Sequence, residues 1–325
     1  MAGRRLSQNQ ARRVRALHRR HEDESRREDA GTLRAGVVIA RFGRQVEVED
    51  AQAPGVLHRC HIRSNIDSLV AGDRVAWESG DDAHGVVVAR HARTSELLRP
   101  DMHGTPRAAA ANLDQIVIVI APEPPPHANL LDRYLAAAED AGLHALVLLN
   151  KTDLISDRAP FDALLAPYHA IGYTVLHATA HAARGLAELE AALTGHTTAF
   201  VGQSGVGKSS LIAALLPHET LRIGELSQAV TKGRHTTTAA RLYHLPAGGE
   251  LIDSPGIREF SLVHFEPVRV ARGFVEFRPW LGTCRFRDCR HRDEPGCALR
   301  EAVVRGEVSQ SRYASYLQII GDPSS

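Results

Sequence analysis

The chain reads Gly202-Gln203-Ser204-Gly205-Val206-Gly207-Lys208-Ser209, and this stretch matches the phosphate-binding loop pattern G-x-x-x-x-G-K-[ST] without a mismatch. An apolar run, Thr198–Val201, precedes it, and helical spacing over Lys208–Leu216 follows it. Glycines let backbone N–H groups surround phosphates, and a helix N-terminus favours negative charge. We expect Lys208 to contact the β- and γ-phosphates and Ser209 to bind Mg²⁺. The flanking strand and helix disfavour the alternative, an incidental glycine-rich turn.

The sequence around this loop predicts a doubly wound α/β domain over residues 112–265. Gln115–Ala121 and Ala145–Leu149 are continuous apolar runs, typical of parallel strands that are buried on both faces. Asn129–Ala141 lies between them and has the apolar spacing of a helix. The remaining elements are predicted as strands at Tyr173–Ala178 and Thr198–Val201 and as helices at Leu186–Leu193 and Lys208–Leu216.

The segment before this domain, residues 33–98, predicts a small β-barrel. Five short alternating or β-branched runs are separated by turn residues such as Ala53-Pro54-Gly55, and an OB-fold is the simplest barrel with that spacing. An SH3-like barrel has a similar pattern. Residues 1–32 are polar and basic, with seven arginines and no carboxylate in the first 20, which predicts a disordered arm.

Two further motifs follow predicted strands and complete a guanine-nucleotide site. Asp253-Ser254-Pro255-Gly256 has the D-x-x-G form, in which the carboxylate holds Mg²⁺ and the Gly256 amide contacts the γ-phosphate. Asn150-Lys151-Thr152-Asp153 is the guanine-reading N-K-x-D element. An ionised Asp153 accepts hydrogen bonds from guanine N1–H and N2–H₂, whereas adenine offers no such pair of donors. Thr179-Ala180 fits a backbone contact to guanine O6, although an ordinary strand-to-loop junction explains it almost as well.

The order of these motifs is unusual. Most GTPases run phosphate loop, D-x-x-G and then N-K-x-D, whereas here N-K-x-D comes first. A parallel sheet can be cut in one loop and rejoined in another without losing its site. The sequence therefore predicts a circularly permuted GTPase domain.

The segment between the phosphate loop and D-x-x-G contains candidate catalytic residues. Threonines in this interval are typical of a switch loop, and Thr237 is the expected ligand of Mg²⁺ and the γ-phosphate. Ile257 stands where Ras-like enzymes carry a water-orienting glutamine, so intrinsic hydrolysis is expected to be slow. His235 is the nearest candidate for positioning water, although a lone histidine is more often structural. Lys232, one of only three lysines, is a weaker candidate for a phosphate contact.

Residues 266–325 predict a zinc-binding domain that ends in a helix near Gln310–Ile320. Cys284-x4-Cys289-x-His291-x5-Cys297 supplies the ligand set of one structural Zn²⁺. Nine arginines against five carboxylates, with interleaved aromatic residues, occupy residues 269–305. This composition suits RNA backbone contact and base stacking, although a solvated charged face explains part of it.

Composition excludes several classes of protein. No run approaches 18 apolar residues, so no membrane span is expected, and no apolar stretch follows the basic N-terminus as in a secretory signal. Three of the four cysteines fall in the expected metal site, which indicates a reducing compartment rather than a disulfide framework. A cytoplasmic location is expected.

Together these motifs resemble the small-ribosomal-subunit-dependent GTPases of the RsgA (YjeQ) family, over about Leu33 to Ile320. The resemblance implies an OB-fold, a permuted GTPase domain and a zinc domain. It further implies action in late maturation of the 30S subunit, with contact to 16S rRNA and hydrolysis of GTP to GDP that is slow alone and faster on that particle. We expect the protein to be a monomer. The catalytic residues implied are His235, Thr237 and Lys208. The nucleotide contacts implied are Asn150, Lys151, Thr152, Asp153, Thr179, Ala180, Val201, Gly202, Gln203, Ser204, Gly205, Val206, Gly207, Lys208, Ser209, Ser210, Asp253 and Gly256. The ligands implied are Cys284, Cys289, His291 and Cys297 for zinc, and Ser209, Thr237 and Asp253 for magnesium.

Two other functions compete with this interpretation. A metabolic NTPase or kinase would also use a phosphate loop, but N-K-x-D favours guanine over adenine. A nucleotide-independent RNA-binding scaffold would have no need of Lys208, Ser209 and Asp253, all of which are intact.

Overall fold

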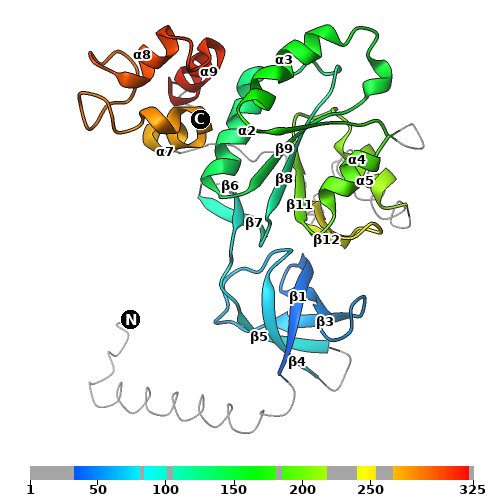
Figure 1. The fold of residues 1–325 in the computed structure, drawn as a ribbon. Helices are drawn as coiled ribbons and strands as arrows, with labels where there is room; N and C mark the ends of the chain where they lie inside the picture. The colour runs from blue at the N-terminus through cyan, green and yellow to red at the C-terminus, as the bar shows by residue number, and fades with distance from the viewer. Residues whose placement is uncertain are drawn as a thin grey trace, which may run out of the picture.

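The computed structural model describes residues 33–80, 84–100, 105–180, 185–217, 240–253 and 266–321. Three parts follow one another along the chain: an N-terminal β-barrel, a central α/β domain and a C-terminal helical segment (Figure 1). The barrel and the C-terminal segment both contact the central domain, but at different places. No helix in the described ranges has the length and apolar character needed to cross a membrane.

The barrel contains the five strands that the sequence predicts. They are β1 (Leu33–Phe42), β2 (Gln45–Asp50), β3 (Leu57–Ile62), β4 (Arg74–Ser79) and β5 (His84–Arg90). Antiparallel pairing of β1 with β4 closes the barrel, and β3 pairs in parallel with β5. Its small core packs around the fully buried Trp77. Gly85 lies against this ring, since a Cβ there would come 2.8 Å from a Trp77 ring carbon. Cys60 belongs to the same core.

A two-stranded sheet connects the barrel to the central domain, and the sequence does not predict it. It consists of β6 (Glu96–Pro100) and β7 (Pro106–Ala111), which pair antiparallel. Its second strand is mostly alanine, with neither alternation nor β-branched residues, so no strand pattern marks it. The strand ends at Ala111, and the next residue, Asn112, has a left-handed backbone (φ 55°) and leads into the central domain.

The central domain is built on parallel strands in the order β10-β9-β8-β11-β13, with β12 antiparallel beside β13. The sequence predicts strands β8 to β11 and the end of strand β13, but it does not predict β12. The bounds are β8 (Gln115–Ile120), β9 (His144–Leu149), β10 (Thr174–His177), β11 (Thr197–Val201), β12 (Arg241–His244) and β13 (Glu250–Asp253). Every residue of β8 is buried, as expected of a central strand covered on both faces.

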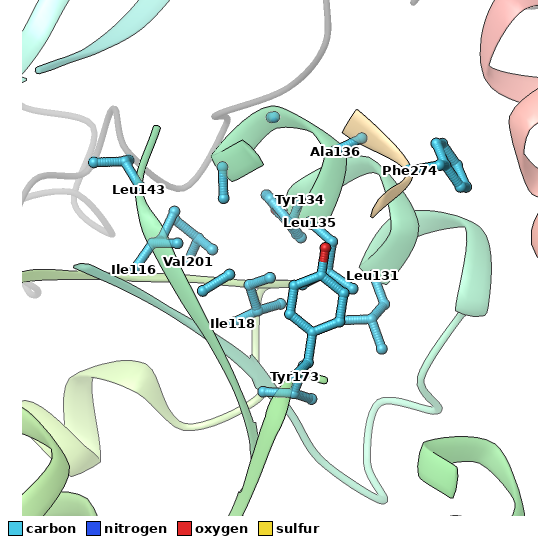
Figure 2. Close-up of a cluster of buried hydrophobic side chains, with 14 of the residues drawn as sticks. Ile116, Ile118, Leu131, Tyr134, Leu135, Ala136, Leu143, Tyr173, Val201 and Phe274 are labelled. Atoms are coloured by element: carbon cyan, nitrogen blue, oxygen red, sulfur yellow. The ribbon is translucent and has the colours of Figure 1, made fainter. Parts of the chain in front are cut away.

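Helices cover the sheet and form two apolar layers with it. The helices are α2 (Ala128–Asp140), α3 (Ala159–Ala170), α4 (Ala187–Leu193) and α5 (Lys208–Leu215). Three of them were expected, whereas α3 was not, because its two prolines, Pro160 and Pro167, obscure the helical pattern. Figure 2 shows Leu131 and Leu135 of α2 gathered with Ile116 and Ile118 of β8.

The C-terminal segment packs on α2. It contains α7 (Pro267–Gly273), the 3₁₀ helix η3 (Val275–Trp280), α8 (Ala298–Val304) and α9 (Gln310–Gly321), of which only α9 was expected. Phe274 joins the core of the central domain near Ala136 (Figure 2). At Gly273 a Cβ would come 2.6 Å from the Ala136 carbonyl oxygen, so glycine allows α7 and α2 to touch backbone to backbone.

Candidate nucleotide-binding and metal-binding sites

The expected nucleotide-binding residues lie at one edge of the sheet, where the parallel strands end. The phosphate loop follows β11, Asn150 follows β9, Thr179 lies two residues after β10, and Asp253 ends β13. Because the carboxyl ends of parallel strands share one edge, segments about 100 residues apart in sequence meet there. This is the usual position of a ligand site in an open α/β sheet.

Two glycines of the phosphate loop are required by their surroundings. Gly202 (φ 137°) lies directly after β11, and a Cβ there would come 2.2 Å from the Val119 carbonyl oxygen. Gly207 (φ 94°) precedes α5, and a Cβ there would come 2.4 Å from the Asn150 side-chain nitrogen. Any side chain at either position would therefore break the loop or separate it from its neighbour.

Lys208 begins α5 and is buried. Its Nζ atom donates to the carbonyl oxygens of Gly202 at 2.6 Å and Gln203 at 2.7 Å, which holds the ammonium group inside the loop. The other loop residues differ in exposure. Val201 and Val206 are buried, Gln203 and Ser209 are half-buried, and Ser204 and Ser210 are exposed.

The guanine-reading segment is hydrogen-bonded directly to the phosphate loop. The buried Asn150 side chain donates to the Val206 carbonyl at 2.9 Å. Lys151 has a left-handed backbone (φ 57°), and its Nζ atom donates to the carbonyls of Gly205 at 2.7 Å and Glu123 at 2.8 Å. The lysine therefore spans from β9 across the loop. The two motifs form one connected unit although 50 residues of sequence separate them.

Asp153 is oriented by the segment that follows β10. The Thr179 hydroxyl donates to Asp153 Oδ1 at 2.5 Å, and the Thr152 hydroxyl donates to the Ala178 carbonyl at 3.1 Å. The sequence predicts a backbone contact at Thr179 and Ala180 but not this side-chain contact. A threonine at a strand end beside N-K-x-D was the available signal.

Five residues that the sequence analysis singles out fall outside the described ranges, namely Lys232, His235, Thr237, Gly256 and Ile257. Asp253 is described and half-buried. Asp253 ends β13, and β13 pairs in parallel with β11, with Ala199 opposite Ile252. Asp253 therefore lies at the end of the strand next to the one that leads into the phosphate loop and Ser209.

The four expected zinc ligands converge at one point of the C-terminal segment. Their ligand atoms lie within 4.8 Å of one another. Cys284 Sγ lies 3.9 Å from Cys297 Sγ, and His291 Nδ1 lies 3.5, 3.6 and 3.4 Å from the sulfurs of Cys284, Cys289 and Cys297. Bonds of about 2.3 Å to sulfur and 2.0 Å to nitrogen imply tetrahedral edges of roughly 3.5–3.8 Å, so the cluster has the dimensions of a zinc site.

The electrostatics of this cluster also fit a cation. Burial, with contributions from the neighbouring thiols, raises the pKa of Cys289 to about 12, and burial lowers the pKa of His291. A divalent cation reverses the preference of Cys289, since it stabilises the thiolate, and it binds the neutral imidazole that burial already favours at His291. Helix α9 supports the cluster from behind, where the hydroxyl of Tyr313 donates to the His291 carbonyl at 2.6 Å and that of Tyr316 to the Arg290 carbonyl at 2.8 Å.

The fold and the strand order define the class of protein. A phosphate loop, a guanine-reading element and a magnesium-type aspartate share one sheet edge in permuted chain order, between a five-stranded barrel and a Cys₃His cluster. The molecule is a circularly permuted GTPase. A family model described as RsgA GTPase matches residues 90–263, and the chain belongs to that family.

Comparison with known proteins agrees with this assignment. A relative from Azotobacter vinelandii, named small ribosomal subunit biogenesis GTPase RsgA, is 56% identical over 90% of this chain and 86% of its own length. One of the same name from Pseudomonas aeruginosa is 52% identical over 97% of this chain and 93% of its own. Among solved structures, YjeQ from Thermotoga maritima aligns with a TM-score of 0.73 at 29% identity, covering 89% of this chain and 98% of that one. YloQ, described as a circularly permuted GTPase, aligns with a TM-score of 0.71 at 27% identity over 90% and 96%.

Proposed function

We propose that this protein binds and hydrolyses GTP during maturation of the small ribosomal subunit in the cytoplasm, as a monomer that contacts 16S rRNA. The names of relatives more than 50% identical over most of the chain support the ribosomal role. The observation that carries the nucleotide chemistry is the direct hydrogen bonding of Asn150 and Lys151 to the phosphate loop, because it joins base recognition to phosphate binding in one unit.

The phosphate loop supplies the groups that bind the triphosphate. Lys208 Nζ, held by loop carbonyls 2.6 and 2.7 Å away, would exchange those partners for the β- and γ-phosphate oxygens. Ser209, Asp253 and Thr237 would hold Mg²⁺, which neutralises charge that develops on the phosphates. The N–H groups from Gly202 to Ser210 would surround the phosphates.

Base choice rests on Asp153. Its carboxylate would accept from guanine N1–H and N2–H₂, and the 2.5 Å hydrogen bond from Thr179 fixes the orientation of the carboxylate before the base arrives. Lys151 would lie over the base with its ammonium held by loop carbonyls. Thr152 and Ala180 would complete the contacts around the base. ATP is excluded because adenine would leave the carboxylate without one of its donors.

Water positioning is assigned to His235, with Thr237 ordering the attacking geometry. Ile257 cannot orient water, so turnover of the isolated protein is slow and the small subunit accelerates it. A structural Zn²⁺ on Cys284, Cys289, His291 and Cys297 would hold the C-terminal segment, whose arginines and exposed Phe286 face RNA.

Two measurements test this proposal. GTP turnover should rise strongly when purified 30S subunits are added, and equal rates with and without the particle would refute the ribosomal role. Asp153→Asn should weaken GTP binding by about 100-fold, on the order of 3 kcal/mol, and should bind xanthosine triphosphate, which has an oxygen in place of N2–H₂. Wild-type GTP affinity in this variant would refute the assignment of the base site.

A further inference from the structure

The N-terminal barrel shares a β-sheet with the part of the GTPase domain that carries Asp253. Strand β12 lies between β13 and barrel strand β1. In register, Ala40 of β1 stands opposite Arg241 of β12, and Arg241 stands opposite Asp253 of β13. The three residues therefore lie in one row across adjacent strands, which puts the backbone of Asp253 about 10 Å from that of the barrel.

Side chains reinforce this row. Arg241 Nη1 donates to Glu47 Oε2 of barrel strand β2 at 2.7 Å, with both side chains mostly buried. Three residues further along β12, His244 Nε2 lies 2.7 Å from Glu49 Oε2, also of β2. Both pairs join β12 to the same barrel strand, and their members are three residues apart on β12 and two residues apart on β2. They hold β12 at two points and so oppose sliding or twisting of the hairpin formed by β12 and β13.

A second barrel segment touches the neighbouring strand. The turn at Gly72 is hydrogen-bonded to β1, since the Gly72 amide donates to the Val38 carbonyl at 2.9 Å. A Cβ on Gly72 would come 3.0 Å from Ile252 Cδ1, so the barrel packs against the residue immediately before Asp253. The barrel thus contacts both strands of the hairpin.

We propose that Glu47 and Arg241 are positioning residues for the magnesium end of the active site, which the barrel completes from outside the GTPase domain. The assignment rests on the proposed function of Asp253 as a magnesium ligand. The guanine-reading residues follow β9 and β10, which lie at the opposite end of the sheet from β12. Loss of the Glu47–Arg241 pair should therefore impair Mg²⁺-dependent turnover and leave base recognition unchanged.

The test is a charge exchange in the full-length protein, measured as the Mg²⁺ concentration that gives half-maximal GTP turnover. Glu47→Arg and Arg241→Glu should each raise this concentration about threefold to fivefold, because each replaces attraction with repulsion. The double variant Glu47→Arg/Arg241→Glu restores the ion pair with the charges exchanged, so its half-maximal Mg²⁺ concentration should return toward the wild-type value. GDP affinity in EDTA should stay the same in all three. Glu78→Arg is the matched control, since it breaks the barrel's Arg63–Glu78 pair (3.2 Å) away from β12, and it should leave the Mg²⁺ dependence unchanged.

Other outcomes are decisive as well. Wild-type Mg²⁺ dependence in Glu47→Arg, or a defect that the double variant does not reverse, would overturn the positioning role. An equal defect in Glu78→Arg would also overturn it, because general damage to the barrel would then explain the loss. Asp253→Asn separates the magnesium-ligand role of Asp253 from the positioning role of Glu47 and Arg241. If Asp253→Asn has no effect on Mg²⁺ dependence, the proposed magnesium ligand is wrong. If Asp253→Asn raises the Mg²⁺ concentration needed for half-maximal turnover and Glu47→Arg does not, only the positioning role is wrong.

Discussion

The barrel and the C-terminal segment attach to the same GTPase domain by different chemistry. The barrel is attached by backbone pairing at Ala40 and Arg241 and by two side-chain pairs, the mostly buried Arg241–Glu47 ion pair and a hydrogen bond between Glu49 and His244, whose side chain is 49% exposed. The C-terminal segment is attached by aromatic rings and a buried arginine. Partly exposed pairs contribute little to stability individually but fix register, whereas a buried charge is costly to disturb. The comparison indicates that backbone pairing and side-chain pairs fix the register of the barrel on the GTPase domain, whereas docking of the C-terminal segment depends on a buried charge.

Arg312 of α9 is the centre of the C-terminal docking. Its guanidinium donates to Asp132 of α2 and to both oxygens of Glu276, and it lies 4.4 Å from the centroid of the Phe274 ring. Arg312 is 3% exposed, and the two carboxylates are 1% and 9% exposed. Tyr168 of α3 adds a hydrogen bond of 2.8 Å to Asp132. The network therefore connects the C-terminal segment to two helices of the GTPase domain.

Removal of the metal ligand set should give the largest effect. Cys289→Ala should unfold the C-terminal segment, because structural zinc contributes on the order of 10 kcal/mol to the folding of such small modules. The barrel and the nucleotide site should remain folded, since neither uses the cluster. Hydrogen exchange across the whole chain measures this, with Cys60→Ala, in the barrel core, as the control for loss of a buried thiol elsewhere. Protection of residues 284–297 that survives in Cys289→Ala would contradict the zinc assignment.

Loss of the buried arginine should come next. Arg312→Leu leaves Asp132 and Glu276 buried without their cation and should lower the free energy of unfolding by about 3–5 kcal/mol. Denaturant unfolding followed by far-UV circular dichroism measures this loss. Arg305→Leu is the matched control, because Arg305 pairs with Glu307 at 2.7 Å but both side chains are about half exposed, and its effect should stay below about 1 kcal/mol. Similar losses in the two variants would show that the docking does not depend on burial of the charge.

The barrel attachment should be most sensitive at Gly72. Gly72→Ala should lower the free energy of unfolding by about 2–4 kcal/mol, since it combines a positive φ of 88° with a Cβ only 2.1 Å from the Ala111 carbonyl oxygen. Gly142→Ala is the control for backbone conformation alone, because Gly142 has φ 67° and open space around it, and about 1 kcal/mol is expected there. If both variants lost the same stability, the close contact between barrel and β7 would have no energetic role.

The sequence alone predicts the fold and the site where one short motif determines both the chemistry and the local structure. The loop from Gly202 to Ser209 requires a strand before it and a helix after it, so its place in the fold followed directly. Apolar runs such as Gln115–Ala121 identified the buried strands for the same reason. The Cys₃His spacing likewise predicted a cluster whose atoms do converge.

What the sequence did not reveal depends on contacts between distant segments. Arg312 and Asp132 are 180 residues apart, and nothing local to either residue distinguishes them from surface charges. Strand β12 is only four residues long and becomes a strand because β13 and β1 flank it. Helix α3 contains prolines at its first turn and near its end, which local propensity alone counts against a helix.

Strand β12 would otherwise be an open edge of the GTPase sheet, and such edges are sites of intermolecular pairing and aggregation. Barrel strand β1 covers it at Ala40. The order of the chain matters here, because residues 33–90 leave the ribosome long before residues 241–244 do. Domains generally fold as units, N-terminal first, during synthesis. A barrel that folds first is then available as a partner when β12 emerges, and the permuted chain covers this edge of the GTPase sheet with a strand made earlier.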